Sequence, residues 1–120
     1  MATPKRENFA FVRGDTWSQN VTIRNNLDEI TEIYFTVKET YNDKIAVIQK
    51  TLTTGGIVYL EDTEDGQKYN VLINATDTDK MKVDTEYVYD MQIVSGTTKI
   101  TVLKGTITLE ADVTKTINEI

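Results

Sequence analysis

The sequence predicts an all-β domain, an antiparallel β-sandwich of seven to nine strands. Three observations lead to this prediction. β-Branched residues, which favour strands, occupy 43 of the 120 positions, as 20 Thr, 12 Ile and 11 Val. Within short runs, apolar residues occupy every second position, so they are all odd-numbered or all even-numbered. We call this their parity, and it is the pattern of a strand with one buried face. Turn residues separate these runs roughly every ten positions, a spacing typical of sandwiches.

The first half of the chain contains three runs that alternate apolar with polar residues. Their apolar positions are Phe9 and Phe11; Trp17, Val21 and Ile23; and Ile33, Phe35 and Val37. Asn25-Asn26 predicts a turn after the second run. The next run, Ile45–Gln49, is ambiguous and is interpreted as an edge strand or a strand-like loop. Ile57–Leu60 is apolar on both faces, and Glu61–Gly66 is expected to be an acidic loop.

The second half continues the alternation in two strong runs. Their in-phase residues are Tyr69, Val71 and Ile73; and Tyr87, Tyr89, Met91 and Ile93. Between them, Ala75–Lys82 is the one plausible helical turn, with Asp77 or Thr78 as its cap. Ser95-Gly96-Thr97 predicts a hairpin turn after the second run.

The last run changes parity, so one extra residue has to be absorbed within it. Its apolar positions are even at Ile100 and Val102 but odd at Ile107 and Leu109. We expect a β-bulge at Lys104-Gly105 to absorb the extra residue.

The domain organisation follows from these runs. Residues 1–8 form a polar N-terminal arm, residues 9–110 the β-sandwich domain and residues 111–120 a C-terminal tail. We expect the arm or the tail to become ordered only against a neighbouring protein.

Composition excludes several classes of function. The chain has no His, no Cys and only two Ser, so histidine-dependent and cysteine-dependent catalysis, thiolate zinc sites and disulfides are all excluded. We therefore expect no enzymatic activity, no catalytic residues, no metal and no cofactor. The net charge of −6 argues against a nucleic-acid partner. The chain has no run of 18 apolar residues and its N-terminus is polar, so no membrane segment and no secretion signal are expected.

Several short motifs have an ordinary structural interpretation. Arg13-Gly14-Asp15 spells the integrin-binding tripeptide, but we expect a structural turn. The acidic segment 61–66 has carboxylates that could bind Ca²⁺, and solvated loop charge is the favoured interpretation. The carboxylates of Asp77, Asp79, Asp84 and Glu86 are interpreted in the same way. Glycoside hydrolysis needs two carboxylates across a cleft, and the sequence shows neither a cleft nor a distinctive pair among these four.

The six tyrosines divide by parity. Tyr69, Tyr87 and Tyr89 are in phase with the apolar residues of their runs and are expected in the core. Tyr34, Tyr41 and Tyr59 are out of phase, which makes them the candidates for contact with a glycan or a partner protein.

We predict an immunoglobulin-like β-sandwich and not a closed barrel, and Tyr87 supports this because it leads into its strand as a tyrosine corner would. In such a corner the tyrosine hydroxyl bonds to backbone upstream. A plain packed tyrosine is the alternative interpretation.

A series of short motifs follows in a characteristic order along the chain. They are Phe11-Val12-Arg13-Gly14-Asp15-Thr16, Ile33-Tyr34-Phe35-Thr36-Val37-Lys38, Asp65-Gly66-Gln67-Lys68-Tyr69, the Asp77-Thr78 turn, Tyr87-Val88-Tyr89-Asp90-Met91-Gln92-Ile93, Gly105-Thr106-Ile107 and Asp112-Val113-Thr114. Over about residues 9–114, the chain resembles a small β-sandwich domain of structural proteins from bacteriophages and prophages of Gram-positive bacteria, and is similar to the N-terminal domain of baseplate upper proteins.

The resemblance implies a non-enzymatic virion protein, an adaptor or decoration module of tail, baseplate or capsid. Its expected partners are other virion proteins and further copies of itself in the particle. The expected location is the virion, after assembly in the host cytoplasm. The alternative function is a carbohydrate-binding module at the virion surface that uses Tyr34, Tyr41 or Tyr59, and a small hydrolase is a third hypothesis.

Overall fold

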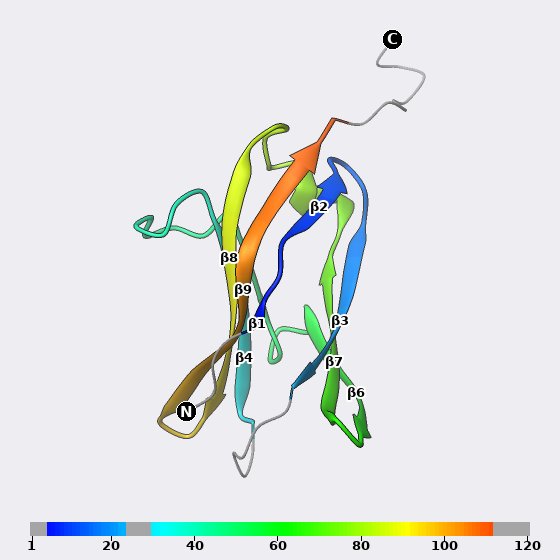
Figure 1. Ribbon diagram of the computed structural model, residues 1–120, viewed down its shortest axis with the longest axis vertical. Helices are drawn as coiled ribbons and strands as arrows, with labels where there is room; N and C mark the ends of the chain where they lie inside the picture. The colour runs from blue at the N-terminus through cyan, green and yellow to red at the C-terminus, as the bar shows by residue number, and fades with distance from the viewer. Residues whose placement is uncertain (1–4, 24–29, 112–120) are drawn as a thin grey trace.

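The computed structural model describes residues 5–23 and 30–111, which form nine strands and one short helix (Figure 1). In chain order these are β1 (Lys5–Arg6), β2 (Phe9–Val12), β3 (Trp17–Ile23), β4 (Glu32–Lys38), β5 (Ile48–Thr51), β6 (Ile57–Thr63), β7 (Gly66–Ile73), α1 (Ala75–Thr78), β8 (Glu86–Ser95) and β9 (Thr98–Glu110). The strands belong to two sheets packed face to face. The predicted all-β architecture of two sheets is confirmed.

The larger sheet has the order β1-β9-β8-β4-β5, with β2 also paired to β9, and the smaller sheet has the order β3-β7-β6. The prediction of a purely antiparallel sandwich is wrong at one edge, because β1 and β2 run parallel to β9. Parallel neighbours need a long connection, and here the rest of the domain lies between β2 and β9. All other strand pairs in the described part of the chain are antiparallel.

The core lies between the two sheets and is built from the in-phase residues of the strands. Tyr69, Tyr87 and Tyr89 are buried in it, as their parity predicts. Near the N-terminal strands the core is aromatic. The Trp17 ring lies 5.0 Å from the ring of Phe9 and 5.1 Å from that of Phe11, and Phe35 stacks on Tyr89 with 5.2 Å between centroids.

The hydroxyl groups of two buried tyrosines form hydrogen bonds with backbone groups of other segments. The backbone N–H of Lys82 donates to the Tyr87 hydroxyl at 2.7 Å, so the hydroxyl bonds to backbone upstream as in a tyrosine corner. The Tyr89 hydroxyl donates to the Glu7 carbonyl at 2.6 Å and so anchors the N-terminal segment. Burial raises the pKa of Tyr89 far above its usual value, which keeps this hydroxyl protonated as a donor.

The predicted β-bulge exists, but it lies at Val102 and not at Lys104-Gly105. Met91 pairs with Leu103 and Gln92 with Thr101, so Val102 is the extra residue that switches the parity of β9. Gly105 serves a different purpose. A Cβ atom at this position would overlap the Glu7 carbonyl oxygen, so glycine is what allows the N-terminal strands to approach β9.

Three further boundaries differ from the sequence-based prediction. The acidic loop is shorter than expected, because residues 61–63 extend β6 and Gly66 begins β7. Glu61 lies opposite Lys68 in the register of the two strands, and opposite charges at such positions favour strand pairing. The ambiguous run at 45–49 becomes an edge strand only from Ile48 onward.

The helical turn is present, but its cap is Asn74 and not Asp77 or Thr78. The Asp77 backbone N–H donates to the Asn74 side chain at 3.2 Å, and the Asn74 backbone N–H donates to the Asp77 carboxylate at 3.1 Å. This reciprocal capping box explains why the helix starts one residue after Asn74.

The remaining sequence-based expectations concern one internal turn, the C-terminal tail and the N-terminal arm. The Asn25-Asn26 turn and the tail from residue 112 onward lie outside the described residues. Within the expected N-terminal arm, Lys5 and Arg6 already pair with Leu103 and Lys104 of the same chain.

No helix in the described ranges is long and apolar enough to cross a membrane.

Candidate functional site

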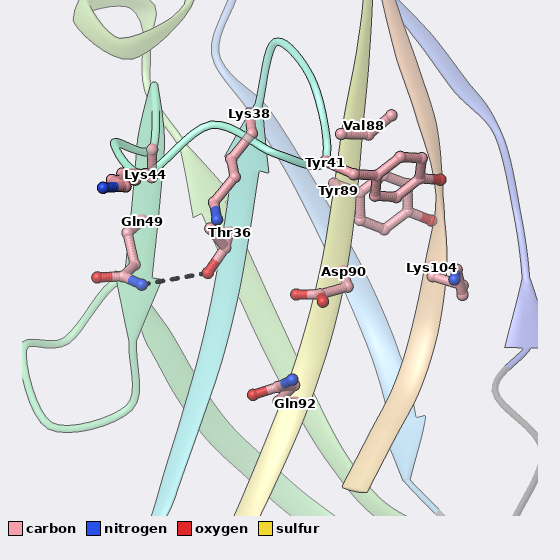
Figure 2. A pocket seen from close by; sticks show the side chains of 11 residues that line it. Thr36, Lys38, Tyr41, Lys44, Gln49, Val88, Tyr89, Asp90, Gln92 and Lys104 are labelled. Carbon is pink, nitrogen blue, oxygen red and sulfur yellow. Dashed lines mark hydrogen bonds between the residues drawn. The ribbon is translucent and has the colours of Figure 1, made fainter.

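The outer face of the larger sheet carries a cavity of about 400 Å³, shown in Figure 2. Strands β4, β5, β8 and β9 form its floor, and the loop between β4 and β5 covers one end. The lining residues are mostly polar and comprise Thr36, Lys38, Tyr41, Lys44, Ala46, Gln49, Val88, Tyr89, Asp90, Gln92 and Lys104.

The alternation of the strands explains this polar floor. Every second residue of β4 and β8 enters the core, so the residues between them face outward. The strand register places Thr36 beside Asp90, and Asp90 beside Lys104. Gln49 lies beside Thr36 on the other side and donates to its hydroxyl at 3.2 Å. Side chains from four strands therefore meet in one row.

The cavity has an excess of positive charge in a protein whose net charge is −6. Three lysines, Lys38, Lys44 and Lys104, line the cavity together with a single carboxylate, that of Asp90, and Lys38 and Lys104 act electrostatically on that carboxylate. Among the described residues, none of these ammonium groups is within 4.0 Å of a carboxylate. Burial raises the pKa of Asp90, while Lys38 and Lys104 oppose this shift only in part.

Tyr41 covers the end of the cavity. It belongs to the loop after β4, whose conformation is held by hydrogen bonds from the Thr40 backbone N–H and hydroxyl to the Asp43 carboxylate. The Lys104 ammonium lies 5.6 Å from the centroid of the Tyr41 ring, within cation–π range. The Tyr41 side chain is 65% exposed, so much of the ring is accessible to a ligand.

The structure does not bring the three out-of-phase tyrosines together. Tyr41 lines the cavity, and Tyr34 lies on the same sheet face, beside Gln92 in register. Tyr59 belongs to the opposite sheet, where its ring contacts Tyr69 and its hydroxyl donates to Asp62 at 2.8 Å. The hydrogen bond with Asp62 raises the pKa of Tyr59. Tyr34 and Tyr41 therefore share one surface and Tyr59 another.

Sequence reasoning missed the polar residues of the cavity floor. Thr36, Asp90 and Gln92 alternate with the apolar residues of their strands, so the sequence places them on the outer face. Polar residues are typical of any solvent-exposed sheet face, so this pattern alone does not indicate a site. What makes them a site is that β4 and β8 are neighbours and that a loop covers one end. Sequence parity does not determine either feature.

A second surface feature is the apolar edge of the smaller sheet, formed by Val58, Tyr59 and Leu60 of β6. Each of these consecutive side chains is 45% to 48% exposed, and Leu72 on the adjacent β7 is 41% exposed. In the described part of the chain β6 pairs with β7 alone, so its other side is an open edge. An open apolar edge is a common site for pairing with another chain.

The Arg13-Gly14-Asp15 tripeptide packs against the turn that contains α1. The Arg13 guanidinium donates to the carbonyl groups of Met81 and Asp79, both at 3.2 Å. The Gly14 backbone N–H donates to the Thr78 hydroxyl at 2.9 Å, and that hydroxyl lies 3.1 Å from the Asp15 carbonyl. Gly14 has a φ of +87°, as a turn glycine would. These contacts agree with the structural turn expected from the sequence.

Thr78→Val is expected to destabilise the protein by about 1–3 kcal/mol, because it removes the partner of the Gly14 N–H in a site where Thr78 is fully buried. Urea denaturation would measure this loss. Thr76→Val is the matched control at an exposed position of the same helix, where the hydroxyl donates to the Asn74 side chain at 2.7 Å, and it should change stability much less because this bond is exposed to water. An equal effect of the two substitutions would contradict the structural role of Thr78.

The candidate carboxylates do not face each other across the cavity. Among the described residues that line it, Asp90 is the one carboxylate, whereas Asp77 lies within α1, where it accepts from the Asn74 N–H and pairs with Lys50. A two-carboxylate hydrolysis mechanism has no second carboxylate there. In the same described ranges, no group of three or more Asp or Glu side chains could hold a metal ion.

No protein-family model matches the chain, and no curated protein is detectably similar to it.

Proposed function

We propose that the protein is a non-enzymatic structural component of a phage or prophage virion, an adaptor or decoration module that acts through protein–protein contacts. The motif order described above suggests the virion context. The observation that carries a contact function is the open edge of β6, where Val58, Tyr59 and Leu60 are exposed in succession. Proteins that stay monomeric usually protect such edges with charge, proline or a covering segment.

The geometry of this edge suits strand addition by a neighbouring virion protein or by another copy of the chain. Backbone N–H and C=O groups on the open side of β6 would pair with the added strand, and the exposed apolar side chains would be covered by it. At the other edge of the same sheet, β3 exposes polar residues such as Ser18 and Asn20. The open edge at β6 therefore exposes consecutive apolar side chains, whereas the exposed side chains of β3 are polar.

We further propose that the sandwich is immunoglobulin-like. The order β3-β7-β6 in one sheet and β4-β8-β9 in the other supports this, because it corresponds to the strand order B-E-D and C-F-G of that fold. The hydrogen bond from the Lys82 N–H to the Tyr87 hydroxyl gives further support. The N-terminal strands, which pair with β9, depart from the arrangement in which the first strand joins the B-E-D sheet.

Val58→Lys is the test of the contact function. Lysine on an open edge opposes strand addition, so assembly with tail or capsid protein from the same genome should be lost. Light scattering at several protein concentrations, with and without these partners, would measure assembly. The free energy of unfolding should change by less than about 0.5 kcal/mol, because Val58 is exposed.

Ser18→Lys on the opposite edge strand β3 is the matched control and should leave assembly intact. Assembly that survives Val58→Lys unchanged would show that the β6 edge is not the contact. A wild-type protein that stays monomeric with every virion partner would contradict the structural role itself.

The cavity favours a second candidate function, a carbohydrate-binding module at the virion surface. Tyr41 offers an exposed ring, and Gln49, Asp90 and Gln92 offer hydrogen-bonding groups beside it. Of the three tyrosines predicted for glycan contact, Tyr41 lies in the cavity and Tyr34 lies beside it.

A further inference from the structure

We propose that the cavity beneath Tyr41 binds a saccharide unit that carries a negatively charged group, either a carboxylate or a phosphate. This inference deepens the carbohydrate-binding candidate by naming the ligand class, and it does not depend on the β6 edge. It is argued from the charge, the hydrogen-bonding groups and the shape of the cavity.

The charge of the cavity selects for an anion. Lys38, Lys44 and Lys104 come from three different segments, and Asp90 compensates one of the three positive charges. Because the described part of the chain places no carboxylate within 4.0 Å of these ammonium groups, an anionic ligand would supply the missing counter-charge. In Figure 2 the Lys38 ammonium lies over the floor of the cavity, near Thr36.

The remaining polar groups suit hydroxyl groups. In Figure 2 the Asp90 carboxylate points toward β4, and it has no hydrogen-bond partner in the described part of the chain. Two adjacent sugar hydroxyls could donate to its two oxygens. Gln49 uses its NH₂ group on Thr36, which leaves its carbonyl oxygen as a further acceptor. A simple inorganic anion would use the lysines but has at most one or two hydroxyl groups for these acceptors.

Shape and aromatic surface favour a sugar over an extended acidic peptide. A volume of about 400 Å³ lies within the usual range of small-molecule sites. Tyr41 covers the end of the cavity with an exposed ring, which provides a flat apolar surface for the face of a sugar. The lining has Ala46 and Val88 as its purely aliphatic side chains, so a peptide would find little apolar surface for its anchoring residues.

The test is a titration of ¹⁵N-labelled protein followed by NMR. The probes are trigalacturonate, glucose 6-phosphate, uncharged maltotriose, inorganic phosphate and a hexaglutamate peptide. We expect the two acidic sugars to shift the backbone amide signals of Thr36, Gln49, Asp90, Gln92 and Lys104, with a Kd on the order of 1 mM. Maltotriose should bind about tenfold more weakly, because it leaves the lysines without a counter-charge.

Three variants separate the contributions. Lys104→Met should weaken binding of the acidic sugars about tenfold and leave maltotriose unaffected. Asp90→Asn should weaken maltotriose, because it removes one acceptor of sugar hydroxyls, and should weaken the acidic sugars less, because it also removes a negative charge that repels them. Lys99→Met, an exposed lysine of the same strand β9 outside the cavity, is the matched control and should change nothing.

Each contrary outcome overturns the inference in a distinct way. Equal affinity for maltotriose and trigalacturonate would refute the anionic ligand but preserve the carbohydrate-binding candidate. No shift with any sugar would refute both for this cavity. Inorganic phosphate that binds as tightly as glucose 6-phosphate would indicate a simple anion site. Tighter binding of hexaglutamate would replace the sugar with an acidic protein segment.

Discussion

Gly105→Ala is expected to displace the N-terminal strands from β9 and to destabilise the protein by about 2–4 kcal/mol. The added Cβ atom would overlap the carbonyl oxygen of Glu7, and this obstacle is backbone, which cannot rotate away as a side chain can. The displacement would also break the hydrogen bond from the Tyr89 hydroxyl to that carbonyl. The side-chain amide oxygen of Asn8, which accepts from the Thr106 N–H, would be displaced as well.

Guanidinium denaturation and tryptophan fluorescence would detect this effect. Trp17 packs against Phe9 and Phe11 of β2, so displacement of β2 should expose the indole to water and shift its emission to longer wavelength. Gly96→Ala is the control. At Gly96 no atom lies within 4 Å of the added carbon, and only the backbone conformation at φ +61° is strained, which costs about 1 kcal/mol. A similar loss in the two variants would contradict the steric role of Gly105.

Asp77→Ala is expected to destabilise the protein by about 2–3 kcal/mol at neutral pH. Asp77 completes the capping box with Asn74, and its carboxylate lies 2.6 Å from the Lys50 ammonium, with both side chains largely buried. This ion pair joins α1 to β5, so the substitution removes one of the two hydrogen bonds of the capping box and leaves a shielded cation unpaired. Asp77→Asn retains the size of the side chain and should lose less. Asp79→Ala, an exposed neighbour, should change stability by less than about 0.5 kcal/mol.

The contribution of Asp77 should depend on pH. Burial opposes its ionisation, but the hydrogen bonds from Lys50 and from the Asn74 N–H outweigh burial, so the pKa of Asp77 lies below its usual value of 3.8. A carboxylate with a lowered pKa stabilises the folded state above its unfolded pKa, and this stabilisation is lost as the pH falls through the folded pKa. The difference in unfolding free energy between wild type and Asp77→Ala should therefore be constant above about pH 5 and shrink below pH 3.8. A difference that stays the same at pH 3 would show that the charge of Asp77 is not what stabilises the fold.

Strand positions could be predicted because the strands have one buried face. Ile33, Phe35 and Val37 alternate with polar residues, and all three are buried as expected. The same reasoning correctly assigned Tyr69, Tyr87 and Tyr89 to the core. Parity also required one extra residue in β9, but it could not distinguish Val102 from Lys104-Gly105, because the position of a bulge depends on the partner strand.

Local signals were less reliable where two strands meet. The acidic segment after Leu60 suggested a loop, yet Glu61 pairs with Lys68 and extends β6. A charge that is unfavourable in an isolated strand is tolerated when a cross-strand partner compensates it. In the same way, Asn74 and Asp77 are both reasonable helix caps, and only the geometry of the chain leaving β7 determines that Asn74 is the cap.

By itself, the sequence determined the β architecture, most of the core side chains and the absence of histidine and cysteine chemistry, because these depend on residue type and period. The tertiary structure decided which strands are neighbours and therefore which polar side chains meet. Asp90, Lys104 and Gln49 are far apart along the chain and share a cavity only because β5, β4, β8 and β9 lie in this order. It also decided that β1 and β2 run parallel to β9, since pairing between the two ends of a domain depends on how the whole chain folds between them.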